Sequence, residues 1–411
     1  MSGGVDGWRE QVGAWVGVLA ERNFRLFFIG FTTSVVGAAM VPVALTFAVL
    51  DSGAGVGAVG EVLASETVPL VVLLLIGGVV ADRFPRKVGM LTSDVVRFFS
   101  QGTLAVLLLT GHPPIWFFMA MAAVIGAGEA FFNPALTGLI PEMVPEGRLQ
   151  QANALRGIAF STGQLLGPSV AGVIVAAGGA GWAIAIDAAT YAVSALCLVG
   201  LRIPAHPPGR SVSMLRQLLD GWREFRSRTW LWLIVAQFAT FNALTFAPFM
   251  VLGAAVAKRD LGGAAPWGAI EAVFGAGSIA GGILAVRVRT RRPLVTGSLV
   301  AATFAIPVAL VAVPAPAWLI ALGAGIAGIG FSIFDTVWET TLQREVPRAV
   351  LSRVSAYDWF GSIAFLPIGF AIAGPLASRF GIRDMLIFAA VWALSPLLVL
   401  GSRSVRSVRS P

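Results

Sequence analysis

Isolated acidic residues inside long apolar stretches are the side chains of this sequence best placed to do chemistry. Glu66 and Glu129 lie near the middle of such stretches, and Glu271 lies in the first third of another. An ionisable group at the centre of a bilayer costs about 2.5–3.5 kcal/mol on insertion scales, so each is a functional candidate by default. A carboxyl group that alternates between apolar and aqueous surroundings can bind a proton in one and release it in the other. These three glutamates are therefore candidates for coupling proton movement to another process.

Other charged residues in the apolar stretches have potential partners close by. Asp94 and Arg97 are three residues apart, so on a helix they share a face and neutralise each other. Three further acids lie near the ends of their stretches, where we expect ion pairs with bases. These acids are Asp335, Glu339 and Asp358, and the bases are Arg344, Arg348 and Arg353.

The chain lacks the residues for metal, redox or nucleophilic chemistry. The single cysteine, Cys197, excludes disulfides within the chain and CxxC motifs, and the two histidines, His112 and His206, fall in proline-bearing loops. Residues 323–328 match a dinucleotide-binding pattern, but they lie in an apolar stretch with no strand before it. No phosphate-binding Gly-Lys-Ser/Thr loop and no Ser/His/Asp set occurs. We therefore expect no cofactor, no bound metal and no enzymatic activity.

The composition is that of a protein whose surface meets lipid. Hydrophobic residues make up 57% of the 411 positions and charged residues only 12%, about half the charged share of a soluble domain. The net charge of +8 could suggest nucleic-acid binding. The basic residues, however, occupy short gaps between apolar spans of about 20 residues, the length that crosses a bilayer. We expect a lipid bilayer as the environment and no nucleic-acid partner.

The apolar stretches predict an all-α polytopic membrane protein with twelve transmembrane helices. Basic residues fall in alternate gaps, which places both termini in the cytoplasm by the positive-inside rule. The predicted spans are 24–50, 57–80, 88–110, 115–138, 152–177, 181–201, 229–256, 266–286, 293–313, 316–338, 355–377 and 383–401.

The longest polar stretch, residues 202–228, divides the chain into six spans and six. Leu215, Leu218, Trp222 and Phe225 recur in it at helical spacing, which predicts an amphipathic cytoplasmic helix. The predicted organisation is an N-terminal segment with an interfacial helix (1–22), a six-helix bundle (23–201), the linker (202–228), a second six-helix bundle (229–401) and a basic tail (402–411).

The two halves resemble each other at an offset of about 200 residues. Gly126, Phe132 and Gly167 recur as Gly328, Phe334 and Gly369, each 202 positions later (328 − 126). Two related halves around a site at the midplane are a transporter architecture.

The loop after the second span resembles the signature loop of the major facilitator superfamily. The matching positions are Gly78, Asp82, Arg83, Arg86 and Lys87. The resemblance implies two six-helix bundles with alternating access, and a loop that latches them together on the cytoplasmic side. The alternative is that these basic residues only set the topology.

Further sequence segments resemble those of the macrolide-efflux and siderophore-exporter branch of the drug:proton antiporters. They occur at residues 132–141, 150–155, 186–191, 338–343 and 351–359. The resemblance covers nearly the whole chain and implies export driven by protons.

The fifth span carries a pattern similar to the superfamily's antiporter motif. Its residues are Gly163, Gly167, Pro168 and Gly172, although small residues also serve ordinary close packing of helices. The arginine that many antiporters carry in the fourth span is absent here. Family geometry places the sixth span at the periphery, which implies a structural pair for Asp187 rather than a coupling role.

Aromatic and amide side chains lie on the spans that line the cavity in this family. Such a pocket suits amphipathic organic molecules, but many of these residues could also pack inside a bundle or face lipid. The candidates are Phe131, Gln164, Gln237, Phe238, Phe241, Asn242, Phe246, Phe274, Phe331 and Phe334.

The sequence thus predicts a monomeric secondary transporter that exports a small hydrophobic or amphipathic molecule in exchange for protons. A metabolite importer or uniporter of the same fold is the first alternative, because fold alone does not decide direction. A non-transporting membrane receptor is the second.

Overall fold

The computed structural model describes residues 17–83, 85–111, 113–145, 148–203, 214–285, 290–313 and 315–409. Within these ranges the side chains of residues 75–83, 137–138, 150, 154, 214–218, 220 and 348–353 are not described. The predicted interfacial helix of the N-terminal segment falls largely outside the described residues.

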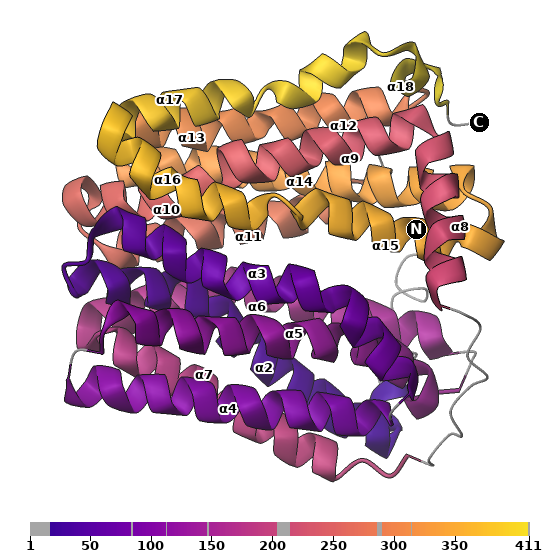
Figure 1. Cartoon of the computed structure of the whole chain (residues 1–411), viewed down its shortest axis with the longest axis horizontal. Helices are drawn as coiled ribbons and strands as arrows, with labels where there is room; N and C mark the ends of the chain where they lie inside the picture. Colours follow the sequence, from indigo (N-terminus) through magenta and orange to yellow (C-terminus); the bar gives the residue numbers. More distant parts are fainter. Residues whose placement is uncertain are drawn as a thin grey trace, which may run out of the picture.

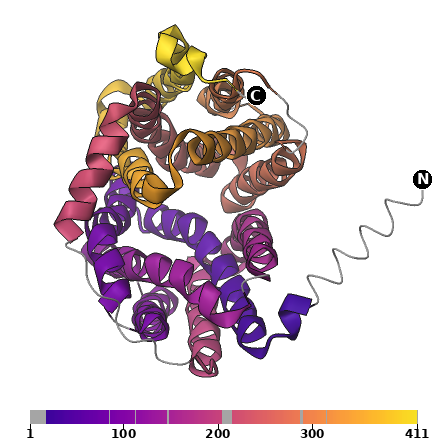
Figure 2. The ribbon, with the colours of Figure 1, turned by 90° about the vertical axis from the view of Figure 1, so that its right-hand side faces the viewer.

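Every element in the described ranges is helical, and the helices form two halves that lie side by side (Figure 1). Their long axes run in the same general direction, so an end-on view looks along most of them (Figure 2). The first half contains α2 (Arg22–Asp51), α3 (Gly55–Arg83), α4 (Arg86–Thr110), α5 (Ile115–Met143), α6 (Leu149–Gly178) and α7 (Ala180–Val199).

The second half follows α8 (Met214–Ser227), which runs across the ends of the other helices (Figure 1). Its unbroken spans are α11 (Ala264–Ala285) and α14 (Ala317–Glu345). The others are built from consecutive pieces, namely α9 (Thr229–Phe241), η2 (Asn242–Phe246), α10 (Ala247–Val256) and η3 (Ala257–Leu261); α12 (Pro293–Ala301), η4 (Ala302–Phe304) and α13 (Ala305–Ala312); α15 (Arg348–Ile363) and α16 (Leu366–Phe380); and α17 (Ile382–Trp392) and η5 (Ser395–Gly401), before the short α18 (Arg403–Ser407).

The lengths and compositions of the helices confirm a multi-pass membrane protein. Among the described residues, eleven helical segments are long and apolar enough to cross a membrane. The one predicted span not among these eleven, 88–110, corresponds to α4, a 25-residue helix that carries Asp94 and Arg97. The predicted all-α, twelve-helix architecture is therefore confirmed.

At irregular turns of the helices in the second half, polar side chains form hydrogen bonds with main-chain oxygens from distant parts of the chain. Asn242, at the π-turn of the seventh span, donates to the main-chain oxygen of Ser362 over 2.9 Å. Thr245 donates to the oxygen of Ala389, also over 2.9 Å. The Ala389 oxygen also accepts from the main-chain N–H of Ala393, so the bond from Thr245 adds a link between helices. An unpaired main-chain carbonyl in hydrocarbon costs several kcal/mol, so a bond such as that from Asn242, beside the break between α15 and α16, makes an irregular helix tolerable in a membrane.

Glycines bring the two halves into backbone contact. A Cβ atom at Gly60 of α3 would collide with the main-chain oxygen of Phe370 in α16, and one at Gly268 of α11 would collide with that of Pro168 in α6. Any larger residue at these positions would push the halves apart.

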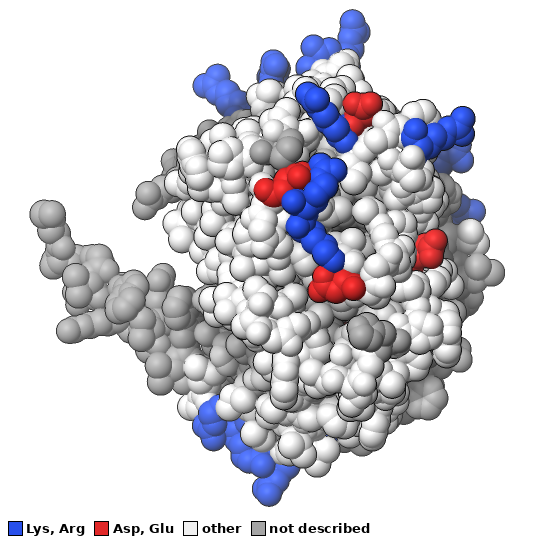
Figure 3. All heavy atoms as spheres, turned by 90° about the vertical axis from the view of Figure 1, so that its left-hand side faces the viewer, with Lys and Arg blue, Asp and Glu red and all other residues white. Residues whose placement is uncertain are grey.

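An ion pair joins the halves at the end of the molecule away from the chain termini (Figure 1). Lys258 Nζ of η3 lies 2.5 Å from Asp51 Oδ1 of α2. Figure 3 shows this end, where few charged side chains interrupt a largely uncharged surface. The halves are thus held together at this end by glycine packing and by a charge pair.

We predict that this contact can be trapped covalently. In a Cys197→Ser background, Asp51→Cys with Lys258→Cys should be cross-linked in membranes by a short bifunctional thiol reagent. Adding Gly60→Val should lower the yield by more than half, because its side chain has no room against α16. Gly102→Val is the matched control, since a Cβ atom there meets nothing within 4 Å. Equal yields in the two glycine variants would contradict the packing described here.

Candidate functional site

A buried cluster of charges lies inside the first half, and we call Asp94, Arg97, Glu129 and Asp187 the charge cluster. Arg97 Nη2 of α4 lies 2.6 Å from Asp94 Oδ1, and both side chains are almost completely buried. The guanidinium carbon is also 4.5 Å from the ring centroid of Phe132 and 4.4 Å from that of Tyr191. The arginine is therefore held by one carboxylate and two aromatic faces, which attract cations most strongly when water is excluded.

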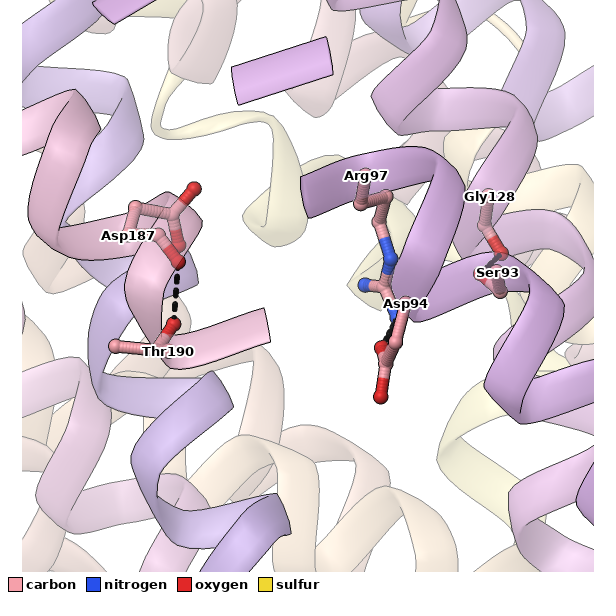
Figure 4. Close-up of polar contacts among 6 residues, drawn as sticks. All are labelled: Ser93, Asp94, Arg97, Gly128, Asp187 and Thr190. Carbon is pink, nitrogen blue, oxygen red and sulfur yellow. Dashed lines mark hydrogen bonds and ion pairs between the residues drawn. The ribbon is translucent and has the colours of Figure 1, made fainter. Parts of the chain in front are cut away.

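Two glycines make room for the charge cluster. A Cβ atom at Gly128 of α5 would lie 2.9 Å from Arg97 Cγ, and one at Gly37 of α2 would collide with Thr190 Oγ1. Ser93 Oγ donates to the main-chain oxygen of Gly128 over 2.6 Å, which fixes α4 against α5 (Figure 4). The cluster therefore depends on close approach of α2, α4, α5 and α7.

Asp187 of α7 is fully buried and only partly satisfied. Its Oδ2 accepts from Gln101 Nε2 over 2.9 Å, while Oδ1 has no hydrogen-bond partner in the described part of the chain. Its main-chain oxygen accepts from Thr190 Oγ1 over 2.7 Å (Figure 4). Among the described residues, Arg97 Nε and the Tyr191 hydroxyl are likewise buried without a partner. Each buried donor or acceptor without a hydrogen bond costs about 1–3 kcal/mol of stability. The cluster therefore contains donors and acceptors that could form further hydrogen bonds in another conformation.

Glu66 and Glu129, two of the predicted coupling residues, come together at this cluster. Both are half-buried. Electrostatic interactions connect Glu66 with Glu129 and Asp187, and Glu129 with Arg97. The main-chain oxygen of Glu66 packs directly on α5 at Gly126, where a Cβ atom would collide with it.

Arg97 and Asp187 join these glutamates, an arrangement that was not predicted from the sequence. The signal was present in α4, whose buried face is polar while its exposed face carries Val95, Val96 and Phe99. The buried polar residues recur at helical spacing, at Ser93, Asp94, Arg97, Ser100 and Gln101. A polar inner face on a membrane span predicts polar partners on the helices around it.

A second candidate site is a cavity of about 440 Å³ between the two halves, which we call the aromatic cavity. One wall comes from α6 and the others come from the second half. It is lined by Phe160, Ser161, Gln164, Pro168, Phe246, Phe249, Met250, Ile270, Glu271, Phe274, Gly275, Ser278, Phe304, Pro307, Ala324, Phe331, Ser332 and Asp335.

Glu271, the third predicted coupling residue, lies in the aromatic cavity and not in the charge cluster. Its Oε1 is buried without a hydrogen-bond partner among the described residues, and the Trp267 side chain lies within hydrogen-bonding reach of the carboxyl group. Asp335 also lines the cavity, but its residue is exposed.

The predicted cavity residues are divided between several environments. Gln164, Phe246, Phe274 and Phe331 line the aromatic cavity. Gln237 and Asn242 do not, because their amides donate to Ser395 Oγ and to the main-chain oxygen of Ser362.

Four aromatic candidates, Phe131, Phe238, Phe241 and Phe334, also lie elsewhere. Phe241 and Phe334 are buried, and each stacks on Phe238 with ring centroids 5.6 Å apart. Phe131 lines a separate apolar groove between α4 and α5.

The antiporter-like motif of α6 provides close contacts on two sides. Cβ atoms at Gly163 and Gly167 would each lie 2.5 Å from side-chain atoms of α2. Gly172 faces α11, with a Cβ-to-oxygen distance of 2.8 Å at Ala264. The small residues thus allow α6 to contact its own half and the second half together.

The described side chains of the signature loop, Arg86 and Lys87, contact other residues of the first half. Arg86 Nη1 lies 2.8 Å from Glu142 Oε1 of α5. Lys87 Nζ donates to the main-chain oxygens of Val199 and Leu201, at the end of α7, where the helix dipole favours a cation. Gly78 and the side chains of Asp82 and Arg83 are not among the side chains that the structure describes.

Asp358, for which an arginine partner was expected, accepts a hydrogen bond from Trp338 Nε1 over 3.0 Å. The side chains of Arg348 and Arg353 are not among those that the structure describes, so the ion pairs expected with these two arginines stay predictions. The ion pair expected between Asp94 and Arg97 is confirmed.

Comparison with known proteins identifies related chains along nearly the whole length. A family model described as Major Facilitator Superfamily matches residues 26–366. A multidrug efflux pump, Tap, from Mycolicibacterium fortuitum is 26% identical over 92% of this chain and 93% of its own. Macrolide efflux protein A from Streptococcus pyogenes is 21% identical over 89% and 92%, and the enterobactin exporter EntS from Citrobacter koseri is 26% identical over 86% and 85%.

Solved structures of low sequence identity share the fold. A bacterial homologue of the human lysosomal transporter Spinster, in an inward-facing and unoccupied conformation, has a TM-score of 0.73, 15% identity, and coverage of 97% of this chain and 99% of its own. The nucleoside transporter NupG has a TM-score of 0.71, with 14% identity over 92% and 98%.

The charge cluster leads to a prediction about stability. Arg97→Met should lower the free energy of unfolding by about 3–5 kcal/mol, because it leaves buried carboxylates without a cation. Thermal unfolding in detergent should show this as a lower midpoint. Arg97→Met with Asp94→Asn should recover part of the loss, since one of the stranded charges is then removed. A single variant as stable as the wild type would contradict the pairing.

Proposed function

The chain belongs to the major facilitator superfamily, and we propose that it exports small hydrophobic or amphipathic compounds in exchange for protons. In this proposal the two halves rock about the aromatic cavity and expose it to each side of the membrane in turn. The protein resides in the cell membrane with both termini in the cytoplasm, as the basic residues in alternate gaps favour. Relatives named as a multidrug efflux pump, a macrolide efflux protein and an enterobactin exporter support export as the direction.

The aromatic cavity supports an organic substrate. Its volume of about 440 Å³ falls within the range of roughly 300–1,000 Å³ of ordinary small-molecule sites. Phe160, Phe246 and Phe274 offer apolar contact, while Gln164 and Ser278 offer hydrogen bonds. Because one wall comes from α6 and the rest from the second half, movement of the halves changes the access to this cavity.

The charge cluster supports proton coupling, and this observation carries the proposal. Glu129 and Asp187 interact electrostatically with the cation Arg97, and Glu66 interacts with both of these acids. A proton taken up by one carboxyl therefore changes the balance of charge for all of them. We propose that Glu66 and Glu129 bind the proton, and that Arg97 exchanges interactions with the acids as the halves move. A membrane potential supplies about 2.3 kcal/mol per charge per 100 mV to drive the cycle.

We predict that Glu66→Gln abolishes coupling. In proteoliposomes with an inward-directed pH gradient, wild-type protein should export a member of a panel of macrolides and fluorescent dyes. Glu66→Gln should lose at least nine-tenths of the gradient-dependent rate, because an amide cannot carry the proton. Glu61→Gln is the matched control, since Glu61 is an exposed residue of the same helix.

The alternatives give different results in the same experiment. Transport that is equal with and without the gradient would contradict proton coupling and favour a uniporter. Accumulation of the compound in the opposite direction would indicate an importer. Full activity of Glu66→Gln together with Glu129→Gln would remove the charge cluster from the mechanism.

A further inference from the structure

We propose that the aromatic cavity selects organic cations, and that Glu271 binds the positive centre of the substrate. This inference rests on the proposed function and narrows its substrate to a class, namely amphipathic molecules that carry a protonated amine or a quaternary centre. It assigns Glu271 to substrate recognition, whereas Glu66 and Glu129 serve proton coupling.

The lining of the aromatic cavity is charged with one sign only. Glu271 and Asp335 are its acids, and none of the described lining residues is basic. Arg156, a basic residue on the same face of α6 as Phe160 and Gln164, lies one turn beyond the lining. An organic anion in this cavity would face two acids without a compensating base.

Glu271 has an unused acceptor at this site. Its Oε1 is buried and has no hydrogen-bond partner in the described part of the chain. Among the described residues, the carboxyl group interacts with the side chain of Trp267, on the preceding turn of α11. A buried carboxylate without a counter-ion is strongly destabilising, and a ligand that brings a positive centre to Oε1 relieves that cost.

Aromatic rings line the same cavity as this acid. Phe274, one turn after Glu271, meets Phe304 edge-on with centroids 6.1 Å apart, and Phe249 meets Phe304 at 5.5 Å. Phe331 lies 6.1 Å from Phe274 by the same measure. The faces of such rings attract cations by about 0.5–2 kcal/mol, and more strongly when water is excluded. A cluster of phenylalanines with one acid therefore fits a lipophilic cation better than a neutral or anionic molecule.

The exposed end of the cavity is also acidic. Asp335 is exposed, and Glu339 follows it one turn later on α14 and is exposed as well. Asp358 interacts electrostatically with both. Negative potential at the mouth of a cleft raises the local concentration of cations and their rate of entry. The mouth and the interior thus favour the same sign of charge.

Two ions of nearly equal shape test this inference without any mutation. Tetraphenylphosphonium and tetraphenylborate both present four phenyl rings, but their charges are opposite. Binding to the purified wild-type protein in detergent, measured by isothermal titration calorimetry, should be at least tenfold tighter for the phosphonium. Equal affinities, or tighter binding of the borate, would overturn the proposal.

Variants locate the effect at Glu271. Glu271→Gln should weaken phosphonium binding at least tenfold, which corresponds to about 1.4 kcal/mol, and leave borate binding unchanged or improved. Glu271→Asp should retain part of the affinity, because the charge is kept, and Glu61→Gln should match the wild type. Unchanged phosphonium binding in a folded Glu271→Gln protein would overturn the assignment.

The experiment separates this inference from the proposed function. Binding is measured at equilibrium without a pH gradient, so it does not depend on proton-driven export. If the phosphonium binds through Glu271 but no compound moves with the gradient, the inference stands and the export proposal fails. If export occurs while Glu271→Gln still binds the phosphonium, the inference fails and the export proposal stands.

Discussion

Burial of one arginine among membrane helices is the constraint on which the first half depends. Arg97 cannot reach water, because 4% of its side chain is exposed, and an uncompensated charge in hydrocarbon is very costly. Compensation requires acids on three helices, two aromatic faces, and glycines that let the backbones approach. The polar face of α4 therefore points inward and its apolar face points outward, the reverse of a soluble helix. Because the arginine contacts side chains of several helices, the proposed function implies that a change of proton number at one acid acts on all of them.

The second half meets a related constraint by a different route. Four of its spans are built from consecutive pieces, and side chains such as Asn242 and Thr245 donate to main-chain oxygens of other helices. The breaks give this half irregular walls, which face the more regular α6 across the aromatic cavity. Glycine contacts hold the halves together at one end, where α3 meets α16 and α6 meets α11. Under the proposed function, the first half responds to protons, the cavity holds the substrate, and the glycine contacts are where the halves separate.

The sequence predicted the helices well because lipid enforces long apolar runs. The run predicted at 24–50 is α2, Arg22–Asp51, and the one at 115–138 is contained in α5, Ile115–Met143. Glu66 and Glu129 were expected inside their spans, and they lie on the neighbouring helices α3 and α5. The environment of Arg97 could not be predicted, since its partners Phe132 and Tyr191 come from other helices. The roles of Gln237 and Asn242 were inaccessible for the same reason, because their acceptors lie more than a hundred residues away.

Under the proposed function, substrate in the aromatic cavity and protons on Glu66 and Glu129 favour opposite arrangements of the two halves, so binding of one releases the other. This coupling is tested most directly by measuring protons released when a transported macrolide or dye is added to the purified, weakly buffered protein in detergent. Binding should release protons from the wild type and from Glu61→Gln, while Glu129→Gln should bind the compound but release fewer protons. Binding without proton release from the wild type, or undiminished release from Glu129→Gln, would contradict the coupling.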